Sequence, residues 1–423
     1  MTVWGRVAHR VASEQPISVA VFGAGYVGRN LVHLLDRLPG FVPAVIVNRS
    51  LKRAIDAYVA TGSRADEVIV AHDERTLRRA IERAAPVVTA EPDLAISYEG
   101  FDVFAETTGA LDYGAAVMLS ALRAHRAVVS INAEVDVAVG WLLHIVAAVH
   151  GGVYTICDGD QPGGQMRTLD RLTHMGFDVV ASLNCKRHLD VHQTIATSAP
   201  YAKRDDTSVA VTVSSGDGTK MNIEQAVVAN LAFLAPDCRG MRGIRTVLDR
   251  ALDDVLRAIS RDGIVDYTLG GDFGAGVFAI GRAKEPEIVR TPLRFFKMGE
   301  GPEYLIFNPH TLVHFEMVQS IAEVALDEAP LWSPIEPPVA DVIAFAKRDL
   351  VAGECLDGIG GDTCYGQIDT VERARGLLPI VFAEHAKVVT AVPRDAPIPV
   401  ESVELDPEAP IIALRRTQEK LLR

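Results

Sequence analysis

Three glycines near the start of the chain, Gly23, Gly25 and Gly28, have the spacing G-x-G-x-x-G. They follow an apolar stretch, residues 17–22, that is typical of a central parallel strand. In such a turn the first glycine permits a sharp bend, the second lets the backbone approach a pyrophosphate, and the third lets a helix pack close to the strand. The helix expected over residues 27–38 would direct its positive end toward the phosphates. The motif therefore predicts a dinucleotide-binding site.

The end of the next expected strand, residues 41–47, discriminates between the two nicotinamide dinucleotides. A site for NAD usually carries Asp or Glu there to hold the ribose 2′-hydroxyl. This chain has Asn48 and Arg49 instead, followed by Lys52 and Arg53. Because no carboxylate is present to repel a 2′-phosphate and three cations are available to bind one, the sequence predicts NADP(H). The alternative is that these cations belong to a solvated helix start.

Strands and helices alternate across the first 150 residues, which predicts an α/β fold with a doubly wound parallel sheet. The strand expected over residues 101–105 leads into small residues where the nicotinamide half of a dinucleotide should lie. A later strand leads into an Asn-Ala-Glu sequence at the same edge of the sheet. The expected cofactor-binding residues are Gly23, Gly25, Tyr26, Val27, Gly28, Asn48, Arg49, Thr107, Thr108, Gly109, Asn132 and Glu134.

Two carboxylates, Asp158 and Asp160, follow the strand expected over residues 153–157. Polar and glycine residues at the carboxyl end of a strand are where an α/β sheet usually builds its site. These carboxylates could orient a lysine, hold substrate hydroxyls or bind a divalent ion. They could equally be turn residues that cap the next helix.

A series of motifs runs along most of the chain: GAGYVG, ETTGA, NAEVD, GDQPGG, NCK, DGTK followed by NIEQAVVAN, and a loop from proline to glycine. This series resembles the homoserine-dehydrogenase-like oxidoreductases, and more closely the deoxyxylulose-phosphate reductoisomerase-like branch with a C-terminal SAF domain. The resemblance implies a Rossmann NADP-binding domain over residues 1–150 and a central α+β catalytic and dimerisation domain over 151–330. A small β-clip SAF domain would follow over 339–423, after a proline-rich linker at 332–338.

The resemblance also implies a catalytic lysine at the end of a central strand, and Lys186 matches it. Lys220 matches a second family lysine that would bind a substrate anion or share the role of acid. A lysine ammonium suits this task because it can donate a proton to a carbonyl as hydride arrives. The alternatives are that Lys186 is a surface cation and Lys220 a turn residue. The catalytic set is Lys186, Lys220, Asp158 and Asp160, and the expected substrate-binding residues are Glu224, Arg239, Arg242 and His310.

The implied activity is NADPH-dependent reduction of a carbonyl on a small anionic, sugar-like substrate, with or without a preceding rearrangement that a divalent metal ion assists. The run around Lys186 is not rich in glycine and asparagine as it is in the branch, and the later loop is richer in arginine. Arginine matches phosphate and carboxylate groups. The departures therefore leave the substrate anionic but its identity open. A homoserine-type dehydrogenase and a non-catalytic NADP-binding sensor or structural protein are the alternatives.

Two histidine pairs, His188 with His192 and His310 with His314, are spaced at i and i+4. On a helix each pair would share a face and could bind zinc. Neither pair occurs in an HExxH motif. Because Asn-Pro precedes His310 and suggests a helix start, His310 is instead expected to face the cleft as a substrate contact.

The overall composition limits the partners. The formal net charge of -13 argues against a nucleic-acid binder. The five cysteines form no CxxC motif, and the N-terminus lacks the apolar run of a signal peptide, so a reducing cytoplasm is expected. Residues 137–156 are apolar but interrupted, which predicts a buried helix and strand rather than a membrane span. A small anionic substrate and a homodimer or homotetramer are the partners expected.

Overall fold

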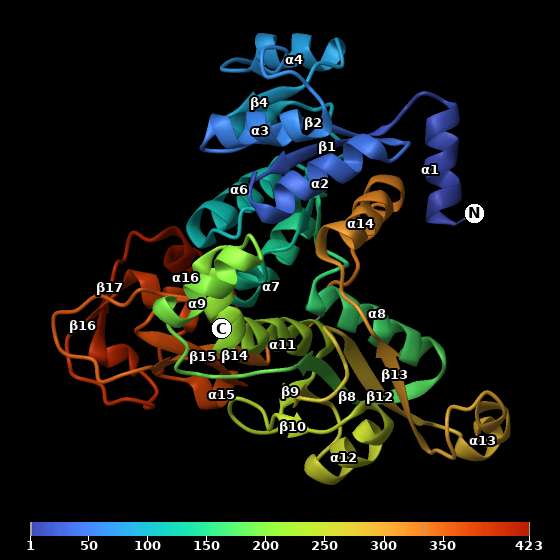
Figure 1. Cartoon of the computed structure of the whole chain (residues 1–423), viewed down its shortest axis with the longest axis vertical. Coiled ribbons are helices and arrows are strands. Elements are labelled where there is room, and N and C mark those ends of the chain that lie inside the picture. Colours follow the sequence, from blue (N-terminus) through green and yellow to red (C-terminus); the bar gives the residue numbers. More distant parts are fainter. Residues whose placement is uncertain (1, 335, 423) are drawn as a thin grey trace. The chain divides into compact units, whose positions relative to one another are not determined.

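The structure is a computed structural model that describes residues 2–334 and 336–422 (Figure 1). It forms two compact units. The first unit contains the residues up to Asp160 together with Leu312–Ser333, and the second contains Gln161–Thr311 together with the residues from Pro334 on. Each unit contains strands and helices, and the α/β fold class is confirmed. The division into three domains stays a prediction.

The first unit is built on a seven-stranded sheet in the order β3-β4-β2-β1-β5-β6-β7, in which every neighbouring pair is parallel (Figure 1). The direction of winding reverses between β1 and β5, and ligands of such sheets bind at the carboxyl ends of the strands beside this point. The elements of the unit are α1 (Val3–Ala12), β1 (Ile17–Phe22), α2 (Tyr26–Arg37), β2 (Phe41–Val47), α3 (Leu51–Thr61), β3 (Ile69–Val70), α4 (Glu74–Glu82), β4 (Val87–Thr89), α5 (Pro92–Ser97), β5 (Val103–Glu106), α6 (Leu111–Arg123), β6 (Ala127–Ser130), α7 (Ala133–His150), β7 (Val153–Ile156) and α14 (Val313–Asp327).

Helix α14 belongs to the first unit although it lies far along the chain. Its buried side chains Met317, Val318 and Ile321 join the core formed by β1, β5 and α2. The guanidinium of Arg6 in α1 pairs with the carboxylate of Asp327 at the end of α14. The core of this unit is therefore completed by a segment that is remote in sequence.

Helix α7 is, among the described residues, the one helix long and apolar enough to cross a membrane. Most of it is buried inside the unit, where it packs against α6 and β7. A buried core helix can have the same length and apolar composition as a membrane span, and the burial of α7 is that of a core helix.

The second unit contains a sheet in the order β10-β11-β8-β12-β13, with β9 also paired to β11. Strands β9, β10, β11 and β8 run parallel to one another, whereas β12 runs antiparallel to both of its neighbours, β8 and β13. The elements up to the end of this sheet are α8 (Gln161–His174), β8 (Phe177–Lys186), α9 (Ile195–Arg204), α10 (Val209–Gly216), α11 (Thr219–Ala232), β9 (Ala235–Pro236), β10 (Ile244–Arg245), η1 (Leu248–Arg250), α12 (Ala251–Ala258), β11 (Ile264–Leu269), β12 (Val277–Ala283), α13 (Pro286–Phe295) and β13 (Glu303–Asn308).

The C-terminal part of the second unit consists of short strands joined by isolated bridges. Two segments of similar sequence, residues 346–354 and 392–399, lie side by side, because Leu350 and Val392 exchange backbone hydrogen bonds of 2.9 and 3.1 Å. The elements are β14 (Ala340–Ala346), β15 (Cys364–Thr370), α15 (Val371–Ala374), η2 (Ile380–His385), β16 (Ala386–Val388), η3 (Val400–Ser402), β17 (Val403–Leu405) and α16 (Pro410–Leu421).

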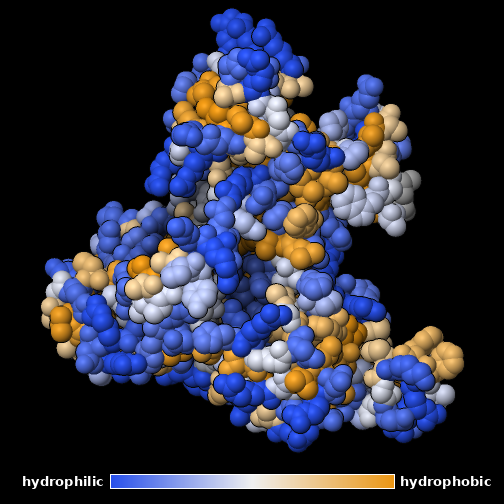
Figure 2. All heavy atoms as spheres, in the orientation of Figure 1, coloured by the Kyte–Doolittle hydropathy of each residue, from blue (hydrophilic) through white to orange (hydrophobic). Residues whose placement is uncertain are grey.

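Helix α13 buries none of its residues within the described structure. Ile288, Phe295 and Phe296 have 68%, 76% and 69% of their surface exposed, and Figure 2 shows the apolar atoms gathered at this end of the unit. The other helices named above that pack on the sheet, α8, α11 and α12, each bury apolar residues. Ile288 and Phe295 of α13, with Phe296 directly after the helix, are therefore exposed apolar side chains of the second unit.

Candidate active site

The glycine turn after β1 has the packing expected of a dinucleotide loop. A Cβ on Gly28 would lie 2.1 Å from the carbonyl oxygen of Gly23 and 2.6 Å from Oγ1 of Thr107. Gly23 adopts a φ of +105°, which favours glycine. A Cβ on Gly25 would meet nothing within 4 Å, and no side chain caps the start of α2. The turn is thus closed where strand and helix meet and open where a pyrophosphate would bind, so these residues fit a dinucleotide.

The tip of β2 carries the cations that the sequence assigns to a 2′-phosphate. The side chain of Asn48 accepts a hydrogen bond of 3.1 Å from the backbone N–H of Ala24, which fixes the tip beside the glycine turn. Arg49 and Arg53 are exposed and form no ion pair among the described residues, whereas Lys52 pairs with Asp56 at 2.7 Å. All three predicted cations therefore face solvent at the edge where an adenosine ribose would lie, and two of them have no ion-pair partner among the described residues.

A buried carboxylate, Glu106, organises the residues at the end of β5. It accepts hydrogen bonds from the backbone N–H and the hydroxyl of Thr108 and from Oγ of Ser130. Asn132 caps α7 by accepting a hydrogen bond from the backbone N–H of Val135 at 3.2 Å. Burial raises the pKa of Glu106, although these hydrogen bonds act in the opposite direction. Sequence reasoning missed Glu106, whose place directly before the Thr-Thr-Gly loop was the available signal.

Strand β8 presents a row of polar side chains on one face. Residues at i and i+2 share a face of a strand, so Ser182, Asn184 and Lys186 point the same way. Ser182 donates to Gln165 of α8 at 2.7 Å, and Asn184 donates to Glu224 of α11 at 2.9 Å. The row therefore faces α8 and α11, with Lys186 at the carboxyl end of the strand.

Helix α11 places a second lysine beside this row. The ammonium of Lys220 lies 3.6 Å from the carboxylate of Glu224, one helical turn away. Burial lowers the pKa of the Lys186 ammonium, Glu224 raises it, and the positive charge of Lys220 lowers it. The structure thus groups Lys186, Lys220 and Glu224, all predicted, with Asn184, which the sequence analysis did not select. A lysine with a lowered pKa can give up a proton more readily than an ordinary lysine.

The start of α11 is held by the C-terminal part of the same unit. Lys347, at the end of β14, forms an ion pair of 2.8 Å with Asp217, and both side chains are almost fully buried. Thr219 and Asn222 accept hydrogen bonds of 2.9 Å from the backbone of β15. The segment expected to resemble a SAF domain therefore supports the helix that carries Lys220.

The predicted arginines make other contacts. Arg239 pairs with Asp369 at 2.6 Å, and Arg242 pairs with Asp237 at 2.7 Å. His310 is exposed. Within the described structure, none of these three residues forms a hydrogen bond or ion pair with Lys186 or Glu224. Their role in binding substrate stays a prediction.

The predicted aspartates Asp158 and Asp160 are both buried in the first unit. The carboxylate of Asp158 accepts a hydrogen bond of 2.9 Å from Ser320 of α14. The Ser320 hydroxyl in turn accepts a hydrogen bond of 2.8 Å from the backbone N–H of Asp158. These contacts tie the loop after β7 to α14, and a catalytic role for either aspartate stays a prediction.

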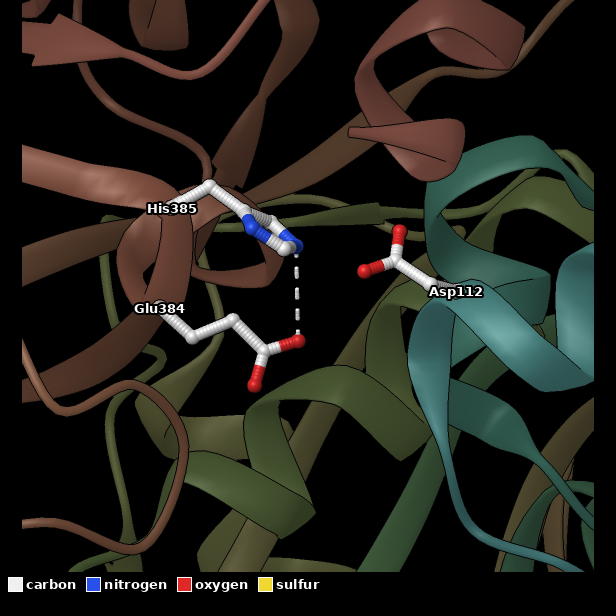
Figure 3. A group of neighbouring side chains, drawn as sticks. All are labelled: Asp112, Glu384 and His385. Atoms are coloured by element: carbon white, nitrogen blue, oxygen red, sulfur yellow. Dashed lines mark ion pairs between the residues drawn. The ribbon is translucent and has the colours of Figure 1, made fainter. Parts of the chain in front are cut away.

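Neither histidine pair lies on one helix, and the helix start suggested at His310 is wrong. His188 and His192 lie in the connection between β8 and α9, and His310 precedes α14, which begins at Val313. In the C-terminal part, His385 and Glu384 form an ion pair of 3.5 Å (Figure 3). Asp112, also drawn there, is a residue of the first unit, and the pair in the second unit offers only two ligands of its own.

Residues 159–317 match the family model described as the catalytic domain of oxidoreductase DRL. No curated protein matches the chain by sequence. The matched segment contains Lys186, Lys220 and Glu224. Because the model describes an oxidoreductase catalytic domain, the chain is an oxidoreductase.

Many solved structures resemble the chain, among them the following three. The 1-deoxy-D-xylulose 5-phosphate reductoisomerase from Zymomonas mobilis in complex with NADPH is 19% identical, with a TM-score of 0.37 over 51% of this chain and 58% of that chain. A DOX-P reductoisomerase in complex with magnesium is 13% identical, with a TM-score of 0.39 over 73% and 79%. The myo-inositol 2-dehydrogenase from Lactobacillus plantarum is 11% identical, with a TM-score of 0.37 over 74% and 91%. Because these identities and TM-scores are low, the assignment of the candidate site depends on the positions of its own residues.

Proposed function

We propose that the chain is an NADPH-dependent oxidoreductase that reduces a carbonyl of a small anionic, sugar-like substrate. The observation that carries the proposal is the group at the end of β8, where Lys186 has a lowered pKa and lies on the face that meets Glu224. The open glycine turn and the exposed Arg49 support the choice of cofactor. The family model over residues 159–317 supports the reaction class.

The residues divide the chemical work as follows. When bound, NADPH supplies the hydride, which adds to the carbonyl carbon. The Lys186 ammonium donates a proton to the carbonyl oxygen and becomes a neutral amine, so the product is an alcohol. Lys220 holds the substrate anion, and Glu224, which accepts a hydrogen bond from Asn184, attracts both ammonium groups by its charge. In the reductoisomerase version a rearrangement of a hydroxyketone precedes this reduction, and a divalent ion assists it.

Several features of the whole protein belong to the same proposal. The enzyme would work in the cytoplasm as a homodimer or homotetramer, with no nucleic-acid or membrane partner. All five cysteines are free, which suits a reducing compartment. The C-terminal part would be a SAF domain that braces α11.

The proposal is tested with Lys186→Met, with Lys203→Met on the exposed face of α9 as the matched control. NADPH binding is measured by its fluorescence, and its oxidation is followed with a panel of phosphorylated and carboxylated carbonyl compounds. Removing a general acid typically lowers the rate about 100- to 10,000-fold. The Lys186 variant should therefore lose turnover while both variants bind NADPH normally. Full turnover in Lys186→Met would remove Lys186 from the mechanism.

Product analysis separates the versions of the reaction. A rearranged carbon skeleton, lost on addition of a metal chelator, supports the reductoisomerase version. An unrearranged product, formed reversibly, supports a homoserine-type dehydrogenase. NADPH binding without oxidation by any compound of the panel contradicts the proposed enzyme and favours a sensor.

A further inference from the structure

An aromatic cluster lies at the start of α2, directly after the glycine turn. It consists of Tyr26, His314 and Phe315. The ring centroids of Tyr26 and His314 are 6.1 Å apart at an interplanar angle of 76°, and those of His314 and Phe315 are 4.3 Å apart. Tyr26 and Phe315 remain 47% and 60% exposed. The aromatic cluster thus joins the first residue of α2 to the first turn of α14, within the first unit.

The first turn of α14 is fixed at the carboxyl edge of the parallel sheet. A Cβ on Gly159, in the loop after β7, would lie 2.3 Å from the carbonyl oxygen of Val313. Asp158 in the same loop is held by the two hydrogen bonds to Ser320 of α14. The turn therefore lies beside both the loop after β1 and the loop after β7. A dinucleotide in such a sheet places its adenosine toward β2 and its nicotinamide half toward β5, β6 and β7.

The His314 ring has a polar atom without a partner. The residue is 8% exposed, and its Nδ1 is fully buried and accepts or donates no hydrogen bond within the described structure. Burial lowers the pKa of His314, so the ring is neutral at pH 7 and can both donate and accept. Buried polar atoms are nearly always paired, and leaving one unpaired costs about 1–3 kcal/mol. A ligand bound at this edge would relieve that cost.

We propose that His314 hydrogen-bonds the nicotinamide half of the dinucleotide and that Tyr26 and Phe315 cover this half with their exposed faces. The inference rests on the proposed function, because it assumes that NADPH occupies the glycine turn. It assigns a cofactor contact to a residue that lies nearly 300 positions after that turn. A neutral imidazole suits such a contact, since it can donate or accept a hydrogen bond without adding a charge.

The test compares ligands that contain or lack the nicotinamide half. Dissociation constants of NADPH and of 2′,5′-ADP are measured for His314→Leu, for His314→Gln and for His33→Leu. His33 is exposed on α2 itself and receives the same substitution as a control. One hydrogen bond corresponds to a change of about threefold to tenfold in affinity. His314→Leu should weaken the binding of NADPH by that factor and leave the affinity for 2′,5′-ADP unchanged. His314→Gln should retain most of the affinity for NADPH.

Two results would overturn the inference. Unchanged NADPH binding in His314→Leu would show that the ring does not contact the cofactor. Equal weakening of NADPH and 2′,5′-ADP would show that the substitution merely disturbs the turn, and the melting temperature of each variant reports such a disturbance. If the unaltered protein binds neither ligand, the proposed function itself fails, and that outcome is distinct from both.

Discussion

The buried ion pair between Lys347 and Asp217 permits a sharp test of how the C-terminal part supports the site. Lys347 also donates to the carbonyl oxygens of Gln193 at 2.9 Å and Gly361 at 2.7 Å, so its ammonium has three partners and faces no solvent. Replacing one member of a buried pair leaves the other charge uncompensated and typically costs about 3–5 kcal/mol. Lys347→Met should lower the free energy of unfolding by that amount.

The loss should depend on pH with a defined sign. Burial raises the pKa of Asp217, and Lys347 is the main group that opposes this shift. Without Lys347, the folded-state pKa of Asp217 rises further above its unfolded value of about 3.9. Stability is then retained below the unfolded pKa and is lost as the pH rises toward the folded one. Urea denaturation should therefore show a larger loss at pH 8 than at pH 5.

Two matched variants complete this experiment. Lys387→Met, at an exposed position of β16, should leave stability within about 0.5 kcal/mol of the unaltered protein. Adding Asp217→Asn to Lys347→Met removes the buried charge and should recover part of the lost stability. Because the pair lies in the second unit, NADPH affinity should be unchanged while kcat/KM falls. A loss below about 1 kcal/mol that is equal at both pH values would refute the reasoning.

Three further predictions concern the first unit. Gly28→Ala should destabilise it by more than about 2 kcal/mol, because the new Cβ would clash with backbone 2.1 Å away, whereas Gly25→Ala should keep its melting temperature and lose NADPH binding. Arg49→Ala should weaken the binding of NADPH about tenfold without changing the affinity for NADH in parallel titrations. Equal effects on both affinities would remove Arg49 from the 2′-phosphate site. Burial raises the pKa of Asp136 to about 6, so stability should fall by about 2 kcal/mol as the pH rises from 4 to 6. Asp136→Asn should abolish that slope in denaturation curves.

Local patterns were sufficient to predict the first sheet. The apolar run before Gly23 and the glycine spacing act over neighbouring residues, and the observed β1 has the predicted bounds. The positions of strands were harder to predict where the burial of a residue depends on partners that are distant in sequence. Strand β11 was not predicted because Asp266 interrupts its apolar pattern. That carboxylate is buried since it accepts backbone hydrogen bonds from Arg242, Gly243 and Tyr267.

The candidate site shows the same limit. Lys186 and Lys220 could be selected by their motifs, but their grouping depends on the contact of Asn184 with Glu224, which lie 40 positions apart. Strand β12 begins at Val277, directly after Gly276, whose backbone passes so close to Asn308 that a Cβ would lie 2.4 Å from the Asn308 carbonyl oxygen. Such close approaches are set by tertiary packing, and neighbouring residues in a single sequence do not predict them.

The return of α14 to the first unit has a consequence for synthesis on the ribosome. Met317, Val318 and Ile321 belong to the core of that unit, yet they are translated more than 150 residues after its last sheet strand, β7. At about 5–20 residues per second, the ribosome needs on the order of 10–30 seconds to deliver them. During that interval the apolar side of α2 lacks its cover. The nascent first unit is therefore a natural client for a chaperone, and a fragment ending at Asp160 should be prone to aggregate.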